Sequence, residues 1–400
     1  MSRSLAWYAW RVDASDPLEL IGQTLRGSWR IERLVHVGAL SHVYRVRRET
    51  DGRRGALKCY VGLAGLSKAL QKNVRDAFVR VGRDVGRLSR AYDGLARPLG
   101  GGWMEMDDGT EIPCVILEWL TGKTLEAMLD AENGRFRRTA TEALALMAAP
   151  LEVLAAAHQL GLAHRDIKPS NFFVCADSLT PDAPIRLLDL SLAKLSRRGE
   201  ASVPRPSVLF MTPNYAAPEQ FRGDDPLIGP WTDVFGVALV LIELMAGYGP
   251  VMQGHTLQAL QAASEDRSRR PCPRTLGLDV PNTVDAVFKR ALAVDVAERY
   301  RDVGAFLRAL YAAAAAEDRV TSSVISRVSG TLDFDPGQDP GHAPPMRLDE
   351  PIRSVPSGTV IATAPRDSSQ TPENTVIAEA PAPVAYTKLS GRPMRRFDPE

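Results

Sequence analysis

A carboxylate, an ammonium group and an amide stand within six positions of this chain, at Asp166, Lys168 and Asn171. They belong to the stretch HRDIKPSNFFV, residues 164–174, in which several charges are followed at once by two phenylalanines and a valine. Phosphoryl transfer asks little covalent chemistry of a protein, but it needs a nucleophile held in line, metal ions on the phosphates and positive charge against the transferred group. Groups of these kinds are present here, so the remaining parts of such a site should lie elsewhere in the chain.

The octet HRDIKPSN resembles the catalytic loop of the protein kinase family. That resemblance implies that Asp166 accepts or orients the proton of a substrate hydroxyl and that Lys168 neutralises the γ-phosphate. It also implies that Asn171 reaches a metal ion. Pro169 is expected to stiffen the turn between these residues, because its ring fixes one backbone angle.

Other motifs resembling this family flank the loop in the expected order. ALKCY places Lys58 on a strand, where it would hold the α- and β-phosphates, and IRLLDLSLAK places Asp189 where the family has a metal-binding aspartate. The segment VILEWL resembles the connection between the two lobes, with Leu117 as gatekeeper and the backbone of Glu118 through Leu120 bound to adenine. The apolar residues expected to sandwich the purine ring are Val35, Val43, Ala56 and Phe173.

Three residues farther along are expected to hold the second lobe in shape. MTPNYAAPEQ resembles the segment that closes the activation loop, and its Glu219 would pair with Arg299 of VAERY. Asp233, in WTDVFGVALV, would brace the catalytic loop from a buried helix. The whole set resembles the bacterial, eukaryotic-like serine/threonine protein kinases over roughly residues 28–315.

The resemblance implies a phosphoryl donor, a metal and a substrate class. The donor would be ATP, and Mg²⁺, for which Mn²⁺ can substitute, would be held by Asn171 and Asp189. Lys168 together with the Ala-Pro-Glu segment at 217–219 favours proteins with Ser or Thr acceptors over small molecules or tyrosine. The expected role is signalling, including autophosphorylation.

The sequence departs from the family pattern in three places. Of the glycine-rich loop only Gly38 is kept, with His36 and Ser41 at the outer glycine positions. Residues 63–100 hold no glutamate to pair with Lys58, so Asp84 is the candidate, although it could equally be a solvated helix residue. The third departure replaces Asp-Phe-Gly by Asp-Leu-Ser. The alternative to an active kinase is therefore a pseudokinase, an ATP-binding scaffold with little or no turnover.

Periodicity and composition predict an α+β fold with a small β-rich lobe, a larger helical lobe and a tail. The tail holds 12 of the 29 prolines and few large aliphatic clusters, so it is expected to be disordered. The predicted units are a leader at 1–27, an N-lobe at 28–117, a hinge at 118–121, a C-lobe at 122–315 and the tail at 316–400.

Bulk properties limit the partners and the compartment. A formal net charge of +1 gives no support for nucleic acid, and four isolated cysteines favour a reducing cytoplasm. No signal sequence or membrane span is expected. The tail repeats TVIATAP as TVIAEAP, so Thr359 and Thr375 could, once phosphorylated, recruit a phosphothreonine-binding forkhead-associated domain, although chance similarity is the simpler reading.

Overall fold

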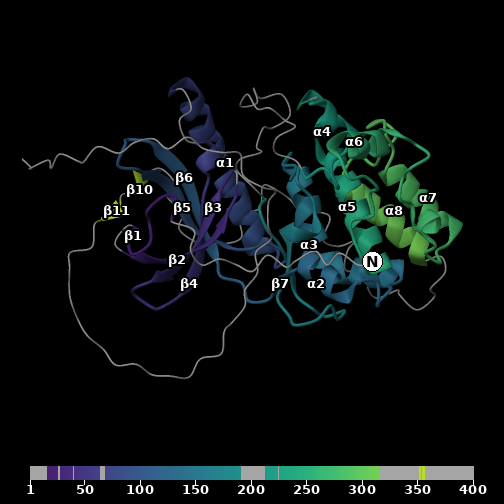
Figure 1. The fold of residues 1–400 in the computed structure, drawn as a ribbon, viewed down its shortest axis with the longest axis horizontal. Coiled ribbons are helices and arrows are strands. Elements are labelled where there is room, and N and C mark those ends of the chain that lie inside the picture. Colours follow the sequence, from purple (N-terminus) through teal and green to yellow (C-terminus); the bar gives the residue numbers. More distant parts are fainter. Residues whose placement is uncertain are drawn as a thin grey trace, which may run out of the picture.

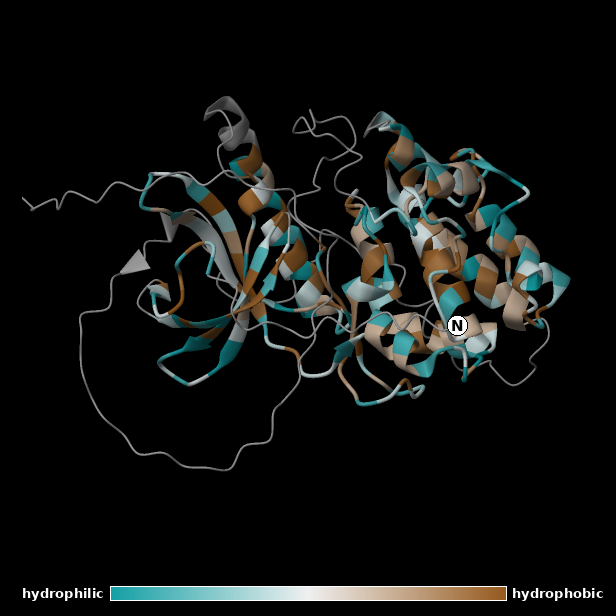
Figure 2. Ribbon diagram, in the orientation of Figure 1, coloured by the Kyte–Doolittle hydropathy of each residue, from teal (hydrophilic) through white to brown (hydrophobic). Residues whose placement is uncertain are grey.

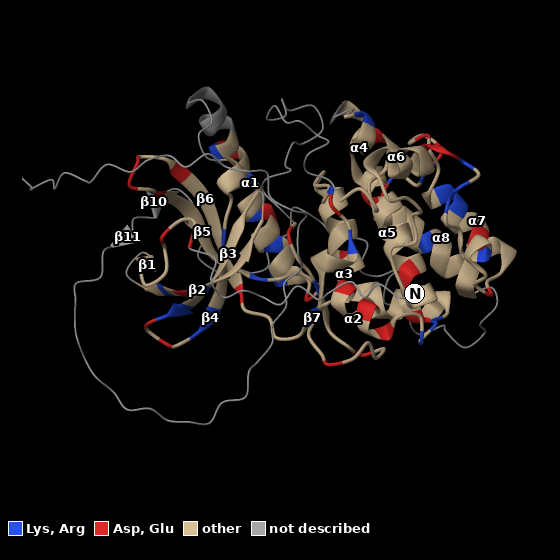
Figure 3. Cartoon of the chain, viewed as in Figure 1, with Lys and Arg blue, Asp and Glu red and all other residues tan. Residues whose placement is uncertain are grey.

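The computed structural model describes residues 16–25, 28–38, 40–63, 68–190, 212–223 and 225–315, and two short strands at 351–352 and 354–355. The chain folds into a β-rich lobe and a helical lobe (Figure 1). The α+β, two-lobed architecture predicted from the sequence is confirmed. Acidic and basic residues are interspersed along the described parts of both lobes, in keeping with the small net charge (Figure 3).

An eight-stranded sheet, in the order β10-β5-β6-β4-β3-β2-β1-β11, forms the first lobe. Within it β3 and β4 form a hairpin whose turn contains Gly52 at φ +73°, a left-handed conformation that glycine adopts readily. Asp-Gly, here Asp51-Gly52, is a pair typical of such hairpin turns. The strands are β1 (Thr24–Leu25), β2 (Trp29–Val37), β3 (His42–Arg48), β4 (Arg54–Cys59), β5 (Pro98–Glu105), β6 (Glu111–Glu118), β10 (Pro351–Ile352) and β11 (Ser354–Val355).

The core of this lobe begins earlier in the chain than residue 28, the boundary expected from the sequence. Leu20 and Leu25 are 2% and 1% exposed and pack in the same cluster as Tyr44. The Tyr44 hydroxyl also donates a hydrogen bond to Asp16 Oδ1 at 2.6 Å. Residues 16–25 are therefore a structural part of the lobe.

Helix α1 (Lys68–Ala91) packs against this sheet after the 3₁₀ turn η1 (Val61–Leu63). Its buried residues Phe78, Val81 and Leu88 recur at helical spacing. The Phe78 ring lies 5.7 Å from the ring of Trp103 on β5. This contact holds the helix against β5, which β6 separates from β4, the strand that carries Lys58.

The second lobe is helical and surrounds a small three-stranded sheet, β7-β8-β9. Its first long helix begins at a capping box, in which Thr139 and Glu142 satisfy each other's backbone N–H groups. The small sheet consists of β7 (Lys123–Thr124), β8 (Phe172–Val174) and β9 (Ile185–Leu187), and the helices are α2 (Leu125–Glu132), α3 (Ala140–Gln159), α4 (Pro218–Arg222), α5 (Pro230–Ala246), α6 (Leu257–Glu265), α7 (Asn282–Ala291) and α8 (Val303–Ala315), with 3₁₀ turns η2 (Pro169–Asn171), η5 (Asp225–Leu227) and η6 (Pro273–Leu276).

Helices α3 and α5 form the apolar centre of this lobe (Figure 2). Within the described ranges α3 is the one helix long and apolar enough to cross a membrane, but 67% of its apolar window is buried inside the lobe. Such burial is typical of the core helix of a globular domain. The most apolar part of α5, residues 236–246, is buried on all sides.

A buried ion pair ties α4 to the end of the lobe, as the sequence predicted. Arg299 binds Glu219 through two parallel hydrogen bonds of 2.7 and 2.8 Å, and the two side chains are 0% and 2% exposed. The remaining guanidinium N–H groups reach backbone carbonyls of Ala293, Trp231 and Val294. All five donors are thus satisfied, which is the condition under which a buried arginine is tolerated.

Removing the cation should leave Glu219 as an unpaired buried charge. We expect Arg299→Met to lower the free energy of unfolding by about 3–5 kcal/mol in urea denaturation. The matched control is Arg301→Met, because Arg301 is 80% exposed in its pair with Asp302 and should change stability by less than about 1 kcal/mol. Equal losses in the two variants would contradict this account of the ion pair.

A second buried carboxylate, Glu243 of α5, has no cation as a partner in the hydrogen bonds of the described structure. Its oxygens accept from the Tyr215 hydroxyl and the Val251 amide, each at 3.1 Å. Burial raises the pKa of Glu243 to about 8. The folded state therefore holds a proton that the unfolded state releases above the ordinary value of 4.5.

This carboxyl should make stability depend on pH. Because its folded pKa is raised, stability should fall as pH rises from about 5 to about 8, by up to about 1.4 kcal/mol per pH unit. Glu243→Gln carries no titrating proton and should flatten this part of the profile, measured by urea denaturation at several pH values. Glu298→Gln, at a side chain 52% exposed, is the control and should keep the parent's slope. A slope unchanged by Glu243→Gln would refute the assignment.

Candidate active site

The catalytic loop lies between α3 and β8, and a buried carboxylate of α5 fixes its backbone. Asp233 Oδ2 accepts from the amide of His164 at 2.6 Å, and Oδ1 accepts from the amide of Arg165 at 2.7 Å. Arg165 has φ +65°, a left-handed conformation that costs a non-glycine residue on the order of 1–3 kcal/mol. Asp233 thus braces the loop, as predicted, and holds it in a strained shape.

His158 of α3 also supports this carboxylate, although no motif in the sequence pointed to it. Its Nε2 lies 2.9 Å from Asp233 Oδ2, while its Nδ1 accepts from the Val303 amide at 3.2 Å. Because Nδ1 is an acceptor, Nε2 must carry the proton that goes to Asp233. Burial acts to raise the pKa of Asp233, but the hydrogen bonds from His158 and the Arg165 amide hold that pKa below its ordinary value.

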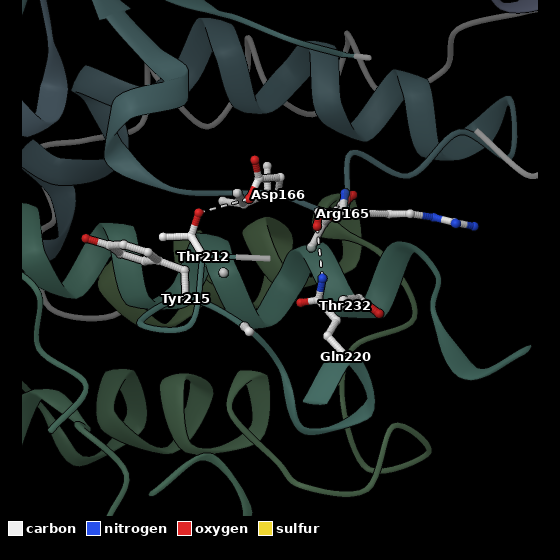
Figure 4. Close-up of a pocket in the computed structure, with 10 residues that line it drawn as sticks. Arg165, Asp166, Thr212, Tyr215, Gln220 and Thr232 are labelled. Carbon is white, nitrogen blue, oxygen red and sulfur yellow. Dashed lines mark hydrogen bonds between the residues drawn. The ribbon is translucent and has the colours of Figure 1, made fainter. Parts of the chain in front are cut away.

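Three reactive groups meet at the loop's surface. Lys168 Nζ lies 3.4 Å from Asp166 Oδ2 and donates to Thr212 Oγ1 at 2.9 Å. The Thr212 hydroxyl in turn donates to Asp166 Oδ1 at 3.3 Å (Figure 4). The carboxylate thus faces an ammonium group on one side and a hydroxyl on the other.

Below these groups lies a small pocket, about 250 Å³ when the space open to solvent is included, which the loop shares with the segment before α4 (Figure 4). Gln220 donates to the backbone carbonyl of Arg165 at 2.9 Å and ties this segment to the loop. The sequence did not single out Gln220. The residues lining the cavity are Arg165, Asp166, Ile167, Thr212, Tyr215, Ala216, Gln220, Thr232, Asp233 and Gly236.

Asn171 is held so that its amide oxygen stays available. Its Nδ2 donates to the backbone carbonyl of Asp166 at 2.6 Å. The other atom, Oδ1, is an acceptor of the kind that Mg²⁺ prefers, as are the carboxylate oxygens of Asp189. The chemistry of the two side chains therefore fits the divalent ion that the sequence implied.

Lys58 and Asp189 meet across the lobes. Lys58 Nζ lies 2.5 Å from Asp189 Oδ2, and the side chains are 12% and 29% exposed. Burial acts to raise the pKa of Asp189, but the charge of Lys58 and its hydrogen bond hold that pKa below its ordinary value. The aspartate has φ +55°, a second left-handed residue beside the cleft.

The ion pair that the structure shows for Lys58 is with Asp189. Asp84, the predicted substitute for the family's helix glutamate, lies half-buried on α1. Its pairing with Lys58 stays a prediction. Of the segment after Asp189, Leu190 is 7% exposed and belongs to the C-lobe core, so leucine supplies the packing expected of phenylalanine. Ser191 lies outside the described residues.

Beside the Lys58–Asp189 pair opens a cavity of about 570 Å³, including its mouth. It includes Val43, Ala56, Leu117 and Phe173, which the sequence had assigned to a purine pocket. Ala96 and Leu188 also line it; Leu188 could have been inferred as the neighbour of Asp189, whereas Ala96 gave no signal. The full lining is Val43, Ala56, Lys58, Ala96, Leu117, Glu118, Trp119, Leu120, Phe173, Leu188 and Asp189.

The polar edge of this cavity is formed by the connection between the lobes. The Glu118 amide donates to the Arg97 carbonyl at 2.8 Å, and the Glu118 carboxylate accepts from the Arg97 amide at 2.9 Å. The Glu118 amide is therefore already used by Arg97. Hydrogen bonds from the backbone of Glu118 through Leu120 to adenine stay a prediction, at a segment that lines the cavity.

Two predicted nucleotide-binding residues lie outside this lining. Val35 is 3% exposed on β2, and Gly38 follows that strand. A Cβ added to Gly38 would lie 3.1 Å from both His36 Nε2 and the Ser41 carbonyl, so the loop backbone is closely packed there. Burial, and then the charge of Lys58, lower the pKa of His36, which leaves a neutral imidazole in the loop at neutral pH. Contacts of Val35 and Gly38 with a nucleotide stay predictions.

Residues 102–310 match the family described as the protein kinase domain. This match spans just over half of the chain, which therefore belongs to the protein kinase family. The match includes the catalytic loop, Asp189, Glu219 and Arg299. It begins after Lys58, so the convergence of Lys58 on Asp189 comes from the structure.

Similar curated proteins are bacterial serine/threonine kinases by name. The chain is 26% identical over 353 residues to serine/threonine-protein kinase PknA of Mycobacterium tuberculosis, covering 88% of this chain and 72% of PknA. It is 27% identical over 278 residues to the probable serine/threonine-protein kinase PknB of Corynebacterium glutamicum, covering 68% of this chain but 40% of that protein. The crystal structure of the M. tuberculosis PknI kinase domain is 24% identical, with a TM-score of 0.47 over 73% of this chain and 98% of that one.

Filling the large cavity should block nucleotide binding without unfolding the chain. Ala56 lies on its wall, so we expect Ala56→Trp to weaken binding of a fluorescent ATP analogue at least tenfold. The control is Ala262→Trp, at an exposed position of α6, which should bind like the parent. Parent-like binding by the Ala56→Trp variant, with an unchanged melting temperature, would show that nucleotide binds elsewhere.

Proposed function

We propose that this chain is an ATP-dependent serine/threonine protein kinase that transfers the γ-phosphate of ATP to Ser or Thr hydroxyls of proteins. The observation that carries the proposal is the presence of two pairs of opposite charges, one on the catalytic loop and one that joins the two lobes. Asp166 and Lys168 lie together on the catalytic loop, and Lys58 and Asp189 pair beside the large cavity. The names of the similar bacterial proteins support the same activity.

In the proposed reaction Asp166 receives the proton of the attacking hydroxyl. As the new bond from hydroxyl oxygen to γ-phosphorus forms, the bond from γ-phosphorus to the bridging oxygen breaks, and ADP leaves with the electron pair. Lys168, already 3.4 Å from the Asp166 carboxylate, stabilises the charge that the transferred group carries. Mg²⁺ bound by Asn171 and Asp189 would neutralise the phosphate oxygens.

In the proposed reaction Lys58 must break its ion pair with Asp189 when nucleotide binds. Its ammonium group is paired with Asp189 in the described structure. The proposed role of Lys58 is to bind the α- and β-phosphates, and that of Asp189 is to bind the metal ion. A metal–triphosphate would therefore interact with both charges of this ion pair. Until the ligand binds, the positive charge of Lys58 and the negative charge of Asp189 compensate each other.

Acceptor choice is proposed from the neighbourhood of Asp166. Thr212, from the segment before α4, contacts both Asp166 and Lys168. Thr212 shows that a short hydroxyl side chain can reach the Asp166 carboxylate, with its Oγ1 3.3 Å from Oδ1. A serine or threonine of a substrate would bring its hydroxyl to the same carboxylate, whereas the longer phenol of tyrosine would need its backbone held farther away.

The remaining parts of the proposal concern partners and place. A cytoplasmic location and a forkhead-associated partner at phosphorylated Thr359 or Thr375 rest on the sequence, because the two threonines lie outside the described residues. Autophosphorylation is proposed on the same footing.

The test is transfer of label from ATP to protein substrates in the presence of Mg²⁺ or Mn²⁺. We expect Asp166→Asn to slow transfer by roughly 10²–10⁴-fold, because it removes the proton acceptor, while nucleotide binding stays at the parent's level. Asp182→Asn, an exposed aspartate between β8 and β9, is the control and should label like the parent. Equal labelling by the parent and the Asp166→Asn variant would defeat the proposal. Binding of ATP without labelling in the parent, across varied substrates, would favour the pseudokinase scaffold.

A further inference from the structure

Two short segments of the tail, which the sequence predicted to be disordered, form strands in the N-lobe sheet. β10 runs parallel to β5, with Pro351 opposite Trp103 and Ile352 opposite Met104. β11 runs antiparallel to β1, with the register given by the pairs Thr24–Val355 and Leu25–Ser354.

These two strands lie at opposite ends of the strand order, although a single residue separates them in the chain. β5 and β1 are the outer strands of the six that the lobe itself supplies. Residues 351–352 pair with one of these strands and residues 354–355 with the other, so the two edges of the sheet lie on either side of this short stretch of chain. The yellow strands beside β1 in Figure 1 show this segment at the sheet.

We propose that residues 351–355 are a docking strand, bound by the N-lobe of their own chain, that closes the sheet by pairing with both of its edges. An edge strand presents unpaired backbone N–H and C=O groups, and a segment added by backbone pairing satisfies them. Recognition of this kind needs an extended backbone more than particular side chains. The bound partner is therefore a short extended peptide, here the tail itself.

The tail's composition fits a strand of limited length. Pro351 and Pro356 stand at its ends, and proline lacks the N–H that a longer ladder would use. The segment can therefore fill the gap between the two edges without extending beyond it. The same prolines keep it from serving as a template for edge-to-edge association of several chains.

The distance along the chain permits docking within one molecule. Helix α8 ends at Ala315, so residues 316–350 connect it to the docking strand. A chain of that length reaches on the order of 100 Å when extended, more than the span of a domain. Tethering also gives the segment an effective concentration near the millimolar range, which favours its own N-lobe over that of a second copy.

Docking would restrain β1 and β5, the two outer strands of the lobe's own sheet. β1 pairs with β2, which leads into the loop at Gly38, and β5 pairs with β6, which ends at Glu118 beside the large cavity. The strand thus links the loop side of the sheet to the side that leads to the helical lobe. This link does not depend on whether the chain transfers phosphate.

Hydrogen–deuterium exchange of the full chain tests the proposal. The double variant Ile352→Pro with Ser354→Pro removes two backbone donors from the docking strand. We expect amides of residues 24–25 and 103–105 to exchange at least roughly tenfold faster in this variant than in the parent. The control carries Ile361→Pro with Ser368→Pro, elsewhere in the tail, and should exchange like the parent.

Two outcomes would overturn the proposal. Exchange at residues 24–25 and 103–105 that is identical in the docking-strand variant and the parent would show that the segment does not protect the sheet edges. Protection that is lost on dilution of the parent would show that the strand comes from a second copy. Protection that persists on dilution and is lost in the variant supports docking within the chain.

Discussion

The catalytic loop takes its shape from one buried carboxylate. A charge removed from water must be compensated by hydrogen bonds, and Asp233 obtains them from the amides of His164 and Arg165 and from His158. The same bonds fix the backbone on which Asp166 stands. Helix α5 comes close enough to do this because Gly236 has no side chain; a Cβ there would lie 2.8 Å from Ile167 Cβ.

The sequence was sufficient to locate the charged side chains of the candidate active site. Asp166, Lys168 and Asn171 are local to one loop, so their spacing alone fixes much of their geometry. The pairing of Glu219 with Arg299, which the structure shows, was expected from the family resemblance. His158 and Gln220 escaped notice because each forms hydrogen bonds with the site's framework and neither lies among the groups expected to react. Many residue types can make such bonds, and nothing in a single sequence marks which one does.

The secondary structure of the N-lobe was harder to predict from the sequence than that of the C-lobe. Alternating patterns predicted the longer strands, but β1, β10 and β11 are two residues each and carry no detectable period. Pairing of the tail with β5 and β1 depends on backbone groups that every sequence has. For the same reason composition alone could neither extend the lobe back to Asp16 nor place the segment at 351–355.

One contact has a consequence for how the chain is made. The Val303 amide holds His158, and His158 holds the carboxylate that shapes the catalytic loop, so a residue near the end of the helical lobe supports a loop 139 positions earlier. A growing chain on the ribosome lacks this support until α8 has begun to emerge. During most of translation, therefore, the loop that carries Asp166 lacks this support. A fragment that ends before α8 also lacks the Val303 amide, which fixes the tautomer of His158.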